Sequence, residues 1–349
     1  MKKFDIHEDP HRRFNPLINE WVLVSPHRAK RPWQGQKETV ANDGMPDYDP
    51  HCYLCPGNVR ANGEVNPQYR SSFVFENDFA ALKQEEIDFN ETNETTFFKI
   101  KPERGISRVV CFSPIHNITL PEMELSSIEE IIRTWQREYA DLGTIDYINY
   151  VQIFENKGSV MGCSNPHPHG QIWAQSSLPT KVEKTQNSLK TYYEKNGSNL
   201  LLDYLKKELE AIERIIIEND HFVALVPFWA IWPFETMIVC KRHVTNIADF
   251  NIEEVTAYAI ILKQLTAKYD NLFETSFPYS SGIHQSPTDG QAHPEWLFHM
   301  HFYPPLLRSA SVKKFMVGYE MMGESQRDIT AEKSAQMLRD LSDVHYKIK

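Results

Sequence analysis

The alternation of apolar and polar residues divides the chain into two halves that share one order of elements. Strand patterns in the first half lie at residues 21–25, 72–75, 97–100, 108–112 and 147–155. Before the last of these, apolar residues spaced three and four apart predict a helix over Ser126–Leu142. The first half closes with a strand that carries His167-Pro168-His169. The polar stretch 180–206 then reads as a linker that becomes a helix running to about residue 217.

The second half repeats this order. Strands are expected at residues 221–226, 236–240 and 296–303, with a helix over 251–269 and a Gly-rich stretch over 279–290. The closing strand carries His299-Met300-His301, and His116 and His243 precede the helix of their respective halves. We interpret the chain as α+β, built from two tandem copies of one unit, each an antiparallel sheet with packed helices. The predicted domains are residues 1–178 and 195–349.

Composition and charge exclude several classes of function. The chain has 349 residues, 41% hydrophobic and 24% charged, which is enough for a sizeable core. The net charge of −10, from 37 Lys and Arg against 47 Asp and Glu, argues against nucleic-acid binding. No apolar stretch reaches the length of a membrane span, and no secretory signal is visible. Five cysteines are too few for a disulfide scaffold, so we expect reduced thiols and a cytoplasmic protein.

The segment SNPHPHGQIW is the strongest local signal for chemistry. In an extended strand, His167, His169 and Gln171 face the same side. Pro168 lacks an amide hydrogen, which places the strand at a sheet edge or a loop boundary, and Gly170 would let a ligand approach the backbone. An imidazole can attack phosphorus and an amide can hold phosphoryl oxygens, so a phosphate-containing ligand is favoured over a polar turn with incidental histidines.

Cys52 and Cys55 form a C-x-x-C pair in a loop-rich region. In a reduced protein this spacing indicates a zinc or redox site, and the absence of a flanking strand and helix favours zinc. A closed zinc site needs four ligands, and no second C-x-x-C occurs, so His116 and His167 are the natural candidates. A C-x-x-C pair without metal is the alternative. We interpret the remaining cysteines as ordinary buried thiols: Cys111, Cys163 and Cys240.

Two weaker signals remain. Three imidazoles could hold a transition metal, although histidines in a duplicated strand also occur as simple hydrogen-bonding groups. These imidazoles belong to His284, His299 and His301. Local basic clusters in an acidic chain indicate a small anionic ligand. The basic residues are Arg28, Arg31, Arg308, Lys313 and Lys314.

Taken together, these motifs resemble the galactose-1-phosphate uridylyltransferase family of the histidine-triad (HIT) superfamily. The resemblance runs along nearly the whole chain, through SPHRAKRPW, CYLCPGNVRANGEVNP, FENDF, FENKG, GCSNPHPHGQIW, WPFET and HFYPPLLRSASVKKFMVGYEM. It implies two HIT-like units and a transferase that converts UDP-glucose and galactose 1-phosphate into glucose 1-phosphate and UDP-galactose. It also implies a ping-pong mechanism in which His169 becomes uridylylated, while Gln171 holds the phosphoryl oxygens and cannot act as an acid or base.

The resemblance further implies metals, substrate contacts and a partner. Zinc would be held by Cys52, Cys55, His116 and His167. A second metal, Fe or Zn, would be held by His284, His299, His301 and a glutamate. Thr185 occupies the position of that glutamate, and Glu183 lies two residues earlier. Either Glu183 takes its place, or the second site is weak or empty. The implied contacts to the UDP-sugar are Arg28, Arg31, Ala61, Asn77, Asp78, Asn156, Gly162, Cys163, Ser164, Gln171, Lys314, Phe315, Tyr319, Glu320 and Gln326. The family is a homodimer, in which the partner would donate the cluster Lys314–Gln326.

Two other functions are weighed against this one. A nucleotide hydrolase or phosphorylase of the same superfamily is the first, but Gln171 argues against hydrolysis and the pair Tyr319-Glu320 favours a hexose substrate. A non-catalytic zinc-binding protein is the second. The net charge of −10 and the intact His-Pro-His-Gly-Gln segment argue against that interpretation.

Overall fold

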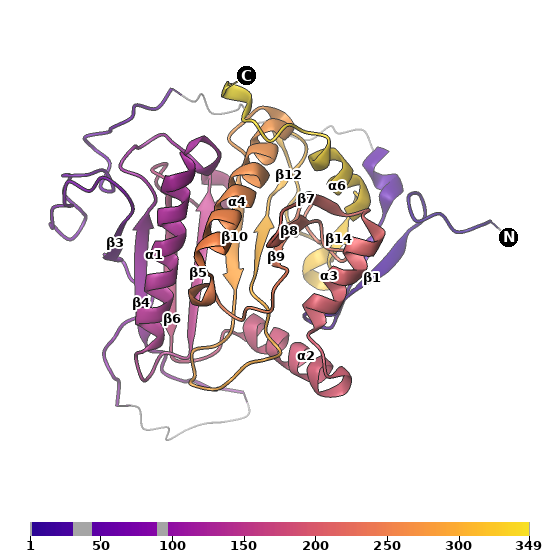
Figure 1. The fold of residues 1–349 in the computed structure, drawn as a ribbon, viewed down its shortest axis with the longest axis horizontal. Coiled ribbons are helices and arrows are strands. Elements are labelled where there is room, and N and C mark those ends of the chain that lie inside the picture. The colour runs from indigo at the N-terminus through magenta and orange to yellow at the C-terminus, as the bar shows by residue number, and fades with distance from the viewer. Residues whose placement is uncertain (1, 31–43, 89–96, 349) are drawn as a thin grey trace.

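A nine-stranded antiparallel sheet runs through both halves of the chain in the computed structural model, which describes residues 2–30, 44–88 and 97–348 (Figure 1). Its strand order is β3-β4-β6-β5-β10-β11-β9-β8-β7. The strands of the first half are β3 (Phe73–Glu76), β4 (Gly105–Cys111), β5 (Tyr150–Lys157) and β6 (His169–Gln175). Those of the second half are β7 (Ile215–Glu218), β8 (Phe222–Leu225), β9 (Thr236–Cys240), β10 (Tyr279–His284) and β11 (His299–Tyr303).

The two halves join edge to edge. Strands β5 and β10 pair in antiparallel register, with Lys157 opposite Tyr279 and Asn156 opposite Ser280. The α+β class with antiparallel strands is confirmed, but the two sheets are continuous rather than separate. The domain boundaries at 178 and 195 stay a prediction.

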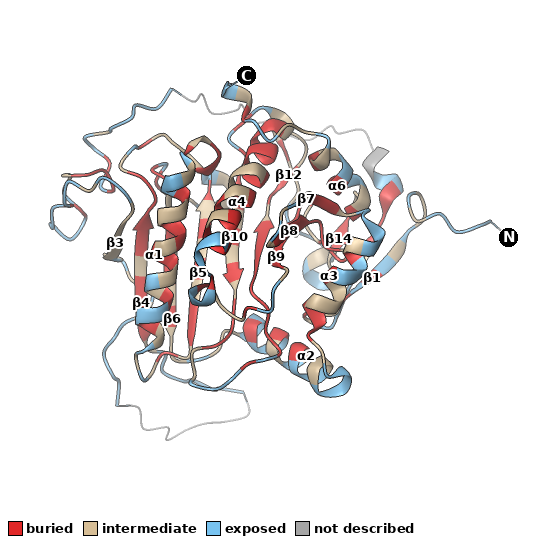
Figure 2. Ribbon diagram, viewed as in Figure 1, coloured by how far each residue is buried: buried red, intermediate tan, exposed pale blue. Residues whose placement is uncertain are grey.

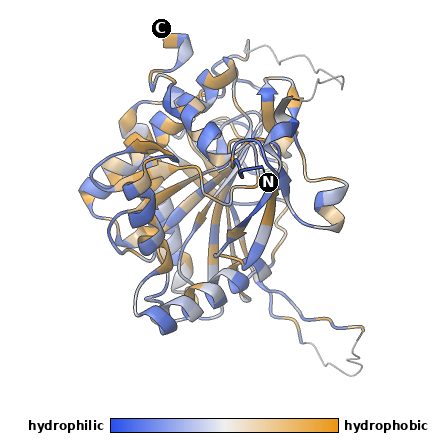
Figure 3. Cartoon of the chain, turned by 90° about the vertical axis from the view of Figure 1, so that its right-hand side faces the viewer, coloured by the Kyte–Doolittle hydropathy of each residue, from blue (hydrophilic) through white to orange (hydrophobic). Residues whose placement is uncertain are grey.

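Helices cover both faces of this sheet. On one face, α1 (Leu125–Gly143) and α4 (Ile252–Phe273) pack side by side (Figures 1 and 2). On the other face, α2 (Thr180–Asn196) and α3 (Leu200–Ala211) contribute to a second apolar cluster. Alternate residues of β9 therefore meet different helices, Ile238 in the first cluster and Met237 in the second, and the whole strand is buried. In Figure 3 the hydrophobic positions gather along the strands and the outer faces of the helices are hydrophilic.

A small sheet ties the two ends of the chain together. Strands β1 (His11–Asn15) and β2 (Glu20–Val24) form a hairpin, and β14 (Gln326–Arg327) adds to β2 in parallel. The remaining C-terminal elements are β12 (Leu306–Ser309), β13 (Val312–Lys313), α5 (Tyr319–Met322) and α6 (Ala331–Arg339). No described helix is long and apolar enough to cross a membrane.

Two predictions of local structure are wrong. Residues 97–100 form no strand, and Phe97 and Phe98 are largely exposed. The stretch 180–206 begins with the helix α2 and not with a linker, because α2 buries a sparse stripe of side chains. The expected helix follows as α3, but it ends at Ala211, and residues 215–217 belong to β7. Asn199 begins α3 by accepting hydrogen bonds from the amides of the second and third residues after it. The Gly-rich stretch that starts at residue 279 contains the strand β10, which the sequence pattern did not indicate.

Candidate active site and metal centres

Strand β6 presents His169 and Gln171 on one face of the sheet. It lies between β4 and β5, with His169 opposite Cys111 and Gln171 opposite Val109. Pro168 precedes the strand, and its carbonyl accepts a hydrogen bond from the Phe112 amide at 2.9 Å. The prediction of a loop boundary at this proline is confirmed, because its missing amide hydrogen falls outside the strand.

Gly170 has a different role from the one expected. It faces the opposite side of the sheet, where an added Cβ would lie 2.8 Å from Cζ of Phe112. The glycine therefore makes room for the Phe112 ring, and the expectation that it admits a ligand is wrong.

The His169 ring is held in one orientation. Its Nδ1 lies 2.7 Å from the backbone carbonyl of His167 and donates a hydrogen bond to it. Nδ1 therefore carries the proton, and Nε2 keeps its lone pair. Burial lowers the pKa of His169, only partly offset by that carbonyl, so the neutral ring is favoured. This is the state in which an imidazole can act as a nucleophile.

A pocket of about 220 Å³ opens in front of this ring. It is lined by Tyr53, Leu54, Ala61, Phe75, Asn77, Asp78, Phe79, Val109, Ser164, His169 and Gln171. Five of the predicted substrate contacts and the predicted nucleophile are among them. Asp78 is held at the wall by Arg60, whose Nη1 donates to Asp78 Oδ1 at 2.9 Å.

The sequence alone does not predict the aromatic residues of this pocket wall. Tyr53, Phe75 and Phe79 lie next to motif residues, but nothing in a single sequence separates an aromatic residue of a pocket from one of a core. Arg60 stacks on Phe75 with 4.4 Å between the guanidinium carbon and the ring centroid. That stacking fixes the plane of the ring at the pocket wall.

The other predicted contacts of the first half lie beside the pocket. The register of β5 and β6 pairs Phe154 with Gln171, so Asn156 falls on the same face as His169. Asn156 Oδ1 accepts a hydrogen bond from Ser280 Oγ at 2.7 Å. Gly162 is in the left-handed conformation, with φ of 83°, at the end of a 3-10 turn. Cys163 Sγ donates to the Asn165 carbonyl at 3.0 Å and is only partly buried, so it is not the ordinary buried thiol that was expected.

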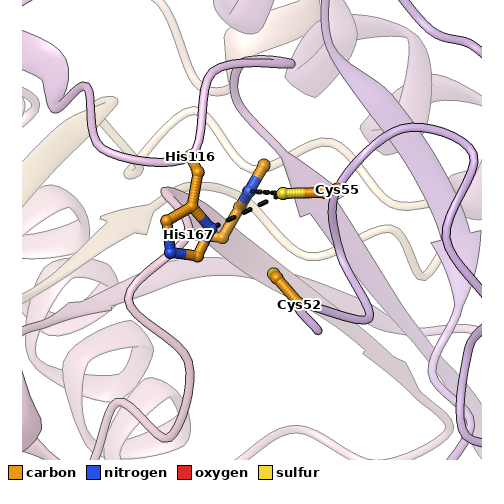
Figure 4. A group of neighbouring side chains, drawn as sticks. All are labelled: Cys52, Cys55, His116 and His167. Atoms are coloured by element: carbon orange, nitrogen blue, oxygen red, sulfur yellow. Dashed lines mark hydrogen bonds between the residues drawn. The ribbon is translucent and has the colours of Figure 1, made fainter. Parts of the chain in front are cut away.

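Four buried side chains form a group that could hold a metal ion. Their ligand atoms all lie within 4.8 Å of one another, and Figure 4 shows the four side chains converging: Cys52, Cys55, His116 and His167. Cys55 Sγ lies 3.6 Å from Nδ1 of His116 and 3.5 Å from Nδ1 of His167. His167 donates from Nε2 to the Ser113 carbonyl at 2.8 Å, which turns its Nδ1 toward the sulfurs.

The electrostatics of this group fit a cation. Burial lowers the pKa of His167 to about 4, so its ring is neutral and can donate a lone pair. Burial also raises the pKa of Cys55 to about 11, and a bound cation would reverse that shift by stabilising the thiolate. Two sulfurs and two ring nitrogens are a typical tetrahedral donor set.

A second group lies on β10 and β11. Ligand atoms of His284, His299 and His301 fall within 4.8 Å of one another. His299 donates from Nδ1 to the Leu297 carbonyl at 2.8 Å, and its buried Nε2 has no hydrogen-bond partner among the residues that the structure describes. Oε1 of Glu235 lies 3.7 Å from Nδ1 of His301.

The expected glutamate is not part of this second group. Glu183 is exposed on α2 and does not belong to the group, whereas Thr185 is buried. In a helix, positions two apart face different sides, so a side chain at 183 cannot replace one at 185. Of the two alternatives, this placement argues against substitution by Glu183 and favours a site without that glutamate.

The remaining predicted contacts lie elsewhere, around β14 and α5. None of them lines the pocket at His169: Arg28, Lys314, Phe315, Tyr319, Glu320 and Gln326. Arg28 Nε and Gln326 Nε2 both donate to Oδ1 of Asp328, at 3.0 and 2.9 Å. Lys314 forms an ion pair with Glu320. Figure 1 shows β14 on the opposite side of the molecule from β4 and β6. Arg31 lies outside the described residues.

Known proteins of one family match this chain along nearly its full length. The family "Galactose-1-phosphate uridyl transferase, N-terminal domain" matches residues 1–179, and the corresponding C-terminal domain matches residues 183–349. Galactose-1-phosphate uridylyltransferase of Haemophilus influenzae is 56% identical over 344 residues, covering 99% of this chain and 98% of that protein. The Saccharomyces cerevisiae protein of the same name is 49% identical over 360 residues, covering 99% and 98%.

Solved structures share the fold. A uridylyltransferase structure has a TM-score of 0.74 at 26% identity, covering 94% of this chain and 97% of that one. An ADP-glucose phosphorylase from Arabidopsis thaliana with bound ADP-glucose has a TM-score of 0.75 at 26% identity, covering 96% of this chain and 100% of that one. Because both family domains match and the relatives are similar over nearly their whole length, the chain belongs to the galactose-1-phosphate uridylyltransferase family.

Proposed function

We propose that this enzyme of galactose metabolism transfers UMP in two steps through a bond between phosphorus and Nε2 of His169. In the first step, the Nε2 lone pair attacks the α-phosphorus of UDP-glucose, the bridging P–O bond breaks, and glucose 1-phosphate leaves with the electron pair. In the second step, a phosphate oxygen of galactose 1-phosphate attacks the same phosphorus. The P–N bond breaks, its electrons return to Nε2, and UDP-galactose forms.

The observation that carries this proposal is the hydrogen bond from His169 Nδ1 to the His167 carbonyl, 2.7 Å long. It directs Nε2 into the pocket and stabilises the positive charge that the ring gains when Nε2 binds phosphorus. The entering phosphate is already an anion and needs no general base, so a single imidazole is sufficient.

Gln171 is placed to hold the phosphoryl oxygens. Its Oε1 accepts a hydrogen bond from Nε1 of Trp173 at 3.2 Å. The amide oxygen is thus engaged, and the amide NH2 group is free to donate to the transferred phosphoryl group. Because an amide cannot take a proton from water, this residue also supports transfer over hydrolysis.

The rest of the pocket suits a uridine. Tyr53, Phe75 and Phe79 offer rings against which a base can stack, and Asn77 and Asp78 offer polar atoms for the base and ribose. We place Ala61 and Ser164 at the uridine end of the substrate as well. Asn156, Gly162 and Cys163 would lie along its diphosphate.

We assign zinc to Cys52, Cys55, His116 and His167, because two thiolates and two imidazoles are a donor set that zinc prefers. When bound, the metal supplies a rigid anchor for the segment that carries His169. For the second group, three histidines could hold Fe or Zn without Glu183. Free thiols at a metal site favour a reducing compartment, and we place the enzyme in the cytoplasm.

A homodimer would bring the predicted substrate contacts around β14 and α5 to the pocket of the other copy. Phe315, Tyr319, Met321 and Met322 are 40%, 52%, 76% and 85% exposed, which is unusual for large apolar side chains so close together. We propose that this segment, with Arg28 and Gln326, reaches the pocket of a second copy. There Arg28, Arg31 and Lys314 would meet phosphate, while Tyr319 and Glu320 would meet sugar hydroxyls.

Isotope exchange tests the two-step mechanism. Radiolabelled glucose 1-phosphate should exchange into UDP-glucose with no galactose 1-phosphate present, and His169→Gly should abolish this exchange while UDP still binds. Exchange that requires galactose 1-phosphate would contradict the covalent step. ADP-glucose with inorganic phosphate tests the phosphorylase alternative, for which we expect no turnover.

A further inference from the structure

A buried network of charged side chains lies under the end of β5, on the sheet face away from the pocket. Lys157 and Asp270 have side chains only 8% and 2% exposed, and Lys157 Nζ donates to Asp270 Oδ1 at 2.9 Å. Successive residues of a strand point to opposite faces, so Asn156 faces the pocket side while Lys157 faces α4. The proposed mechanism gives this network no role.

Asp270 connects three segments that are far apart in sequence. Besides Lys157 on β5, its Oδ1 accepts a hydrogen bond from the Phe277 amide at 2.8 Å, just before β10. Its Oδ2 lies 3.2 Å from Nε2 of His345 in the C-terminal segment. One buried carboxylate on α4 thus fixes the end of β5, the start of β10 and the C-terminal segment together.

A second buried pair lies beside it. Tyr279 donates from its hydroxyl to Oε2 of Glu155 at 3.2 Å, and both side chains are buried. Tyr279 lies opposite Lys157 across the β5–β10 ladder, and Ser280 lies opposite Asn156. The strand pair that presents Asn156 and Ser280 to the site side therefore rests on a charged and hydrogen-bonded underside.

The network also reaches the loop at the pocket. Lys157 is followed by Gly158, whose φ is 87° and whose added Cβ would lie 3.0 Å from Cβ of Pro278. The connection that begins here runs on to β6, and Ser164 within it lines the pocket beside His169. A displacement of β5 at Lys157 would move this loop and would leave Asp270 without its charged partner in the core, which is strongly disfavoured.

We propose that Lys157 is a positioning residue: its ion pair with Asp270, completed by His345, holds Asn156 and the loop 158–164 in place for the nucleotide-sugar. This inference rests on the proposed function and deepens it. The network acts only through Asn156 and the loop, and it touches neither the phosphorus nor the nucleophile.

The test compares Lys157→Met with Lys157→Met/Asp270→Asn and with a matched control, Lys268→Met. Lys268 is a buried lysine like Lys157 but lies on α4, and it donates to the backbone carbonyls of Arg339 and Leu341, away from β5. Two readouts do not depend on turnover. They are the dissociation constant for UDP, measured by calorimetry, and the rate at which a thiol reagent labels Cys163, the one cysteine that is not fully buried.

We expect Lys157→Met to raise the dissociation constant for UDP about tenfold, since small misplacements of binding groups have large effects. Labelling of Cys163 should become faster. The double variant, which removes both charges of the ion pair, should recover thermal stability but keep the weak binding and the fast labelling. The control should lose stability and change neither readout.

Unchanged UDP binding and Cys163 labelling in both Lys157 variants would overturn the proposal and leave the pair a purely structural role. If Lys157→Met does not fold, the double variant decides by the same two readouts. Wild-type protein that binds UDP without forming a covalent adduct would contradict the proposed mechanism, while the comparison of variants would still decide the positioning role. Wild-type protein that does not bind UDP would overturn both.

Discussion

At the scale of single residues, the site depends on which atoms are already engaged. His169 has one ring nitrogen bound to a carbonyl, and Gln171 has its amide oxygen bound to Trp173. Because Nδ1 of His169 and Oε1 of Gln171 already have hydrogen-bond partners, Nε2 of each side chain is the atom that can meet a ligand. The sequence could predict these residues from the His-x-His-x-Gln spacing, but not the hydrogen bonds, because the partners follow from backbone positions that only the folded strand defines.

Gly170 provides a test of packing at this scale. Gly170→Ala would bring a Cβ to 2.8 Å from Phe112, and we expect it to lower stability by about 1–3 kcal/mol, as overpacking does. Adding Phe112→Leu should recover most of the loss, measured by denaturant unfolding. If the single substitution leaves stability unchanged, this account of the glycine is wrong.

The C-x-x-C group makes a prediction about metal content. Cys55→Ala should lose one equivalent of bound metal per chain and lower the unfolding temperature, because a closed site needs all four ligands. Cys240→Ala is the matched control, since Cys240 is equally buried but belongs to neither metal group. Elemental analysis of both variants decides, and equal metal content in the two would refute the assignment.

At the scale of elements, the sequence predicts those helices and strands whose own residues carry a clear pattern. It fails where an element depends on contacts with residues far away in the sequence. Strand β9 and helix α1 follow from their own residues: β9 has the expected bounds, and α1 is one residue longer at each end. Helix α2 gives only a weak helical pattern in the sequence, because its buried stripe is narrow and partly polar: Val182, Thr185 and Leu189. Residues 97–100 show the converse, since their β-favouring residues do not form a strand, and strand propensity depends on the tertiary context.

Strand β1 is held to α6 and β7 by a buried ion network. Arg13 donates from Nη1 and Nη2 to Glu332 at 2.9 Å each, and Arg214 also donates to Glu332 at 2.8 Å. Burial alone would raise the pKa of Glu332, but these arginines lower it to about 2. A lowered carboxyl pKa contributes stability above the ordinary value of 4.5, and that stability is lost as the pH falls toward 2.

We therefore expect Glu332→Gln to lower the free energy of unfolding by about 2 kcal/mol at pH 7. The difference from wild type should narrow as the pH falls below about 4.5, because the unfolded wild-type chain then takes up a proton. Denaturant titrations at several pH values provide the measurement. If the difference stays constant across this pH range, the charge of Glu332 contributes nothing to the free energy of unfolding.

At the scale of the whole molecule, the predicted substrate contacts fall into two groups, one at the pocket beside β6 and one around β14 and α5. The repeated order of elements predicted two α+β units, but not that β5 and β10 would fuse them, because edge pairing depends on backbone positions that a hydrophobic pattern does not encode. The same holds for the site, in which one sequence cannot tell which contacts belong to one copy and which to a partner.

Mixing two inactive variants tests the shared site. His169→Gly and Lys314→Ala should each abolish or strongly reduce turnover alone. If the pocket of one copy uses Lys314 of the other, a reassociated mixture should regain about a quarter of the wild-type activity, since half of the dimers then contain one intact site. A mixture no more active than its two components would place both residues in the same copy.

The central claim is the bond between His169 and the uridylyl group, and the intact mass of the protein tests it most directly. Brief incubation with UDP-glucose alone, quenched at alkaline pH because phosphoramidates are labile in acid, should add the mass of one uridylyl group. The adduct should disappear on addition of galactose 1-phosphate and be absent in His169→Ala. Wild-type protein that turns over both substrates but never carries this mass, or a His169→Ala variant that still does, would contradict the account.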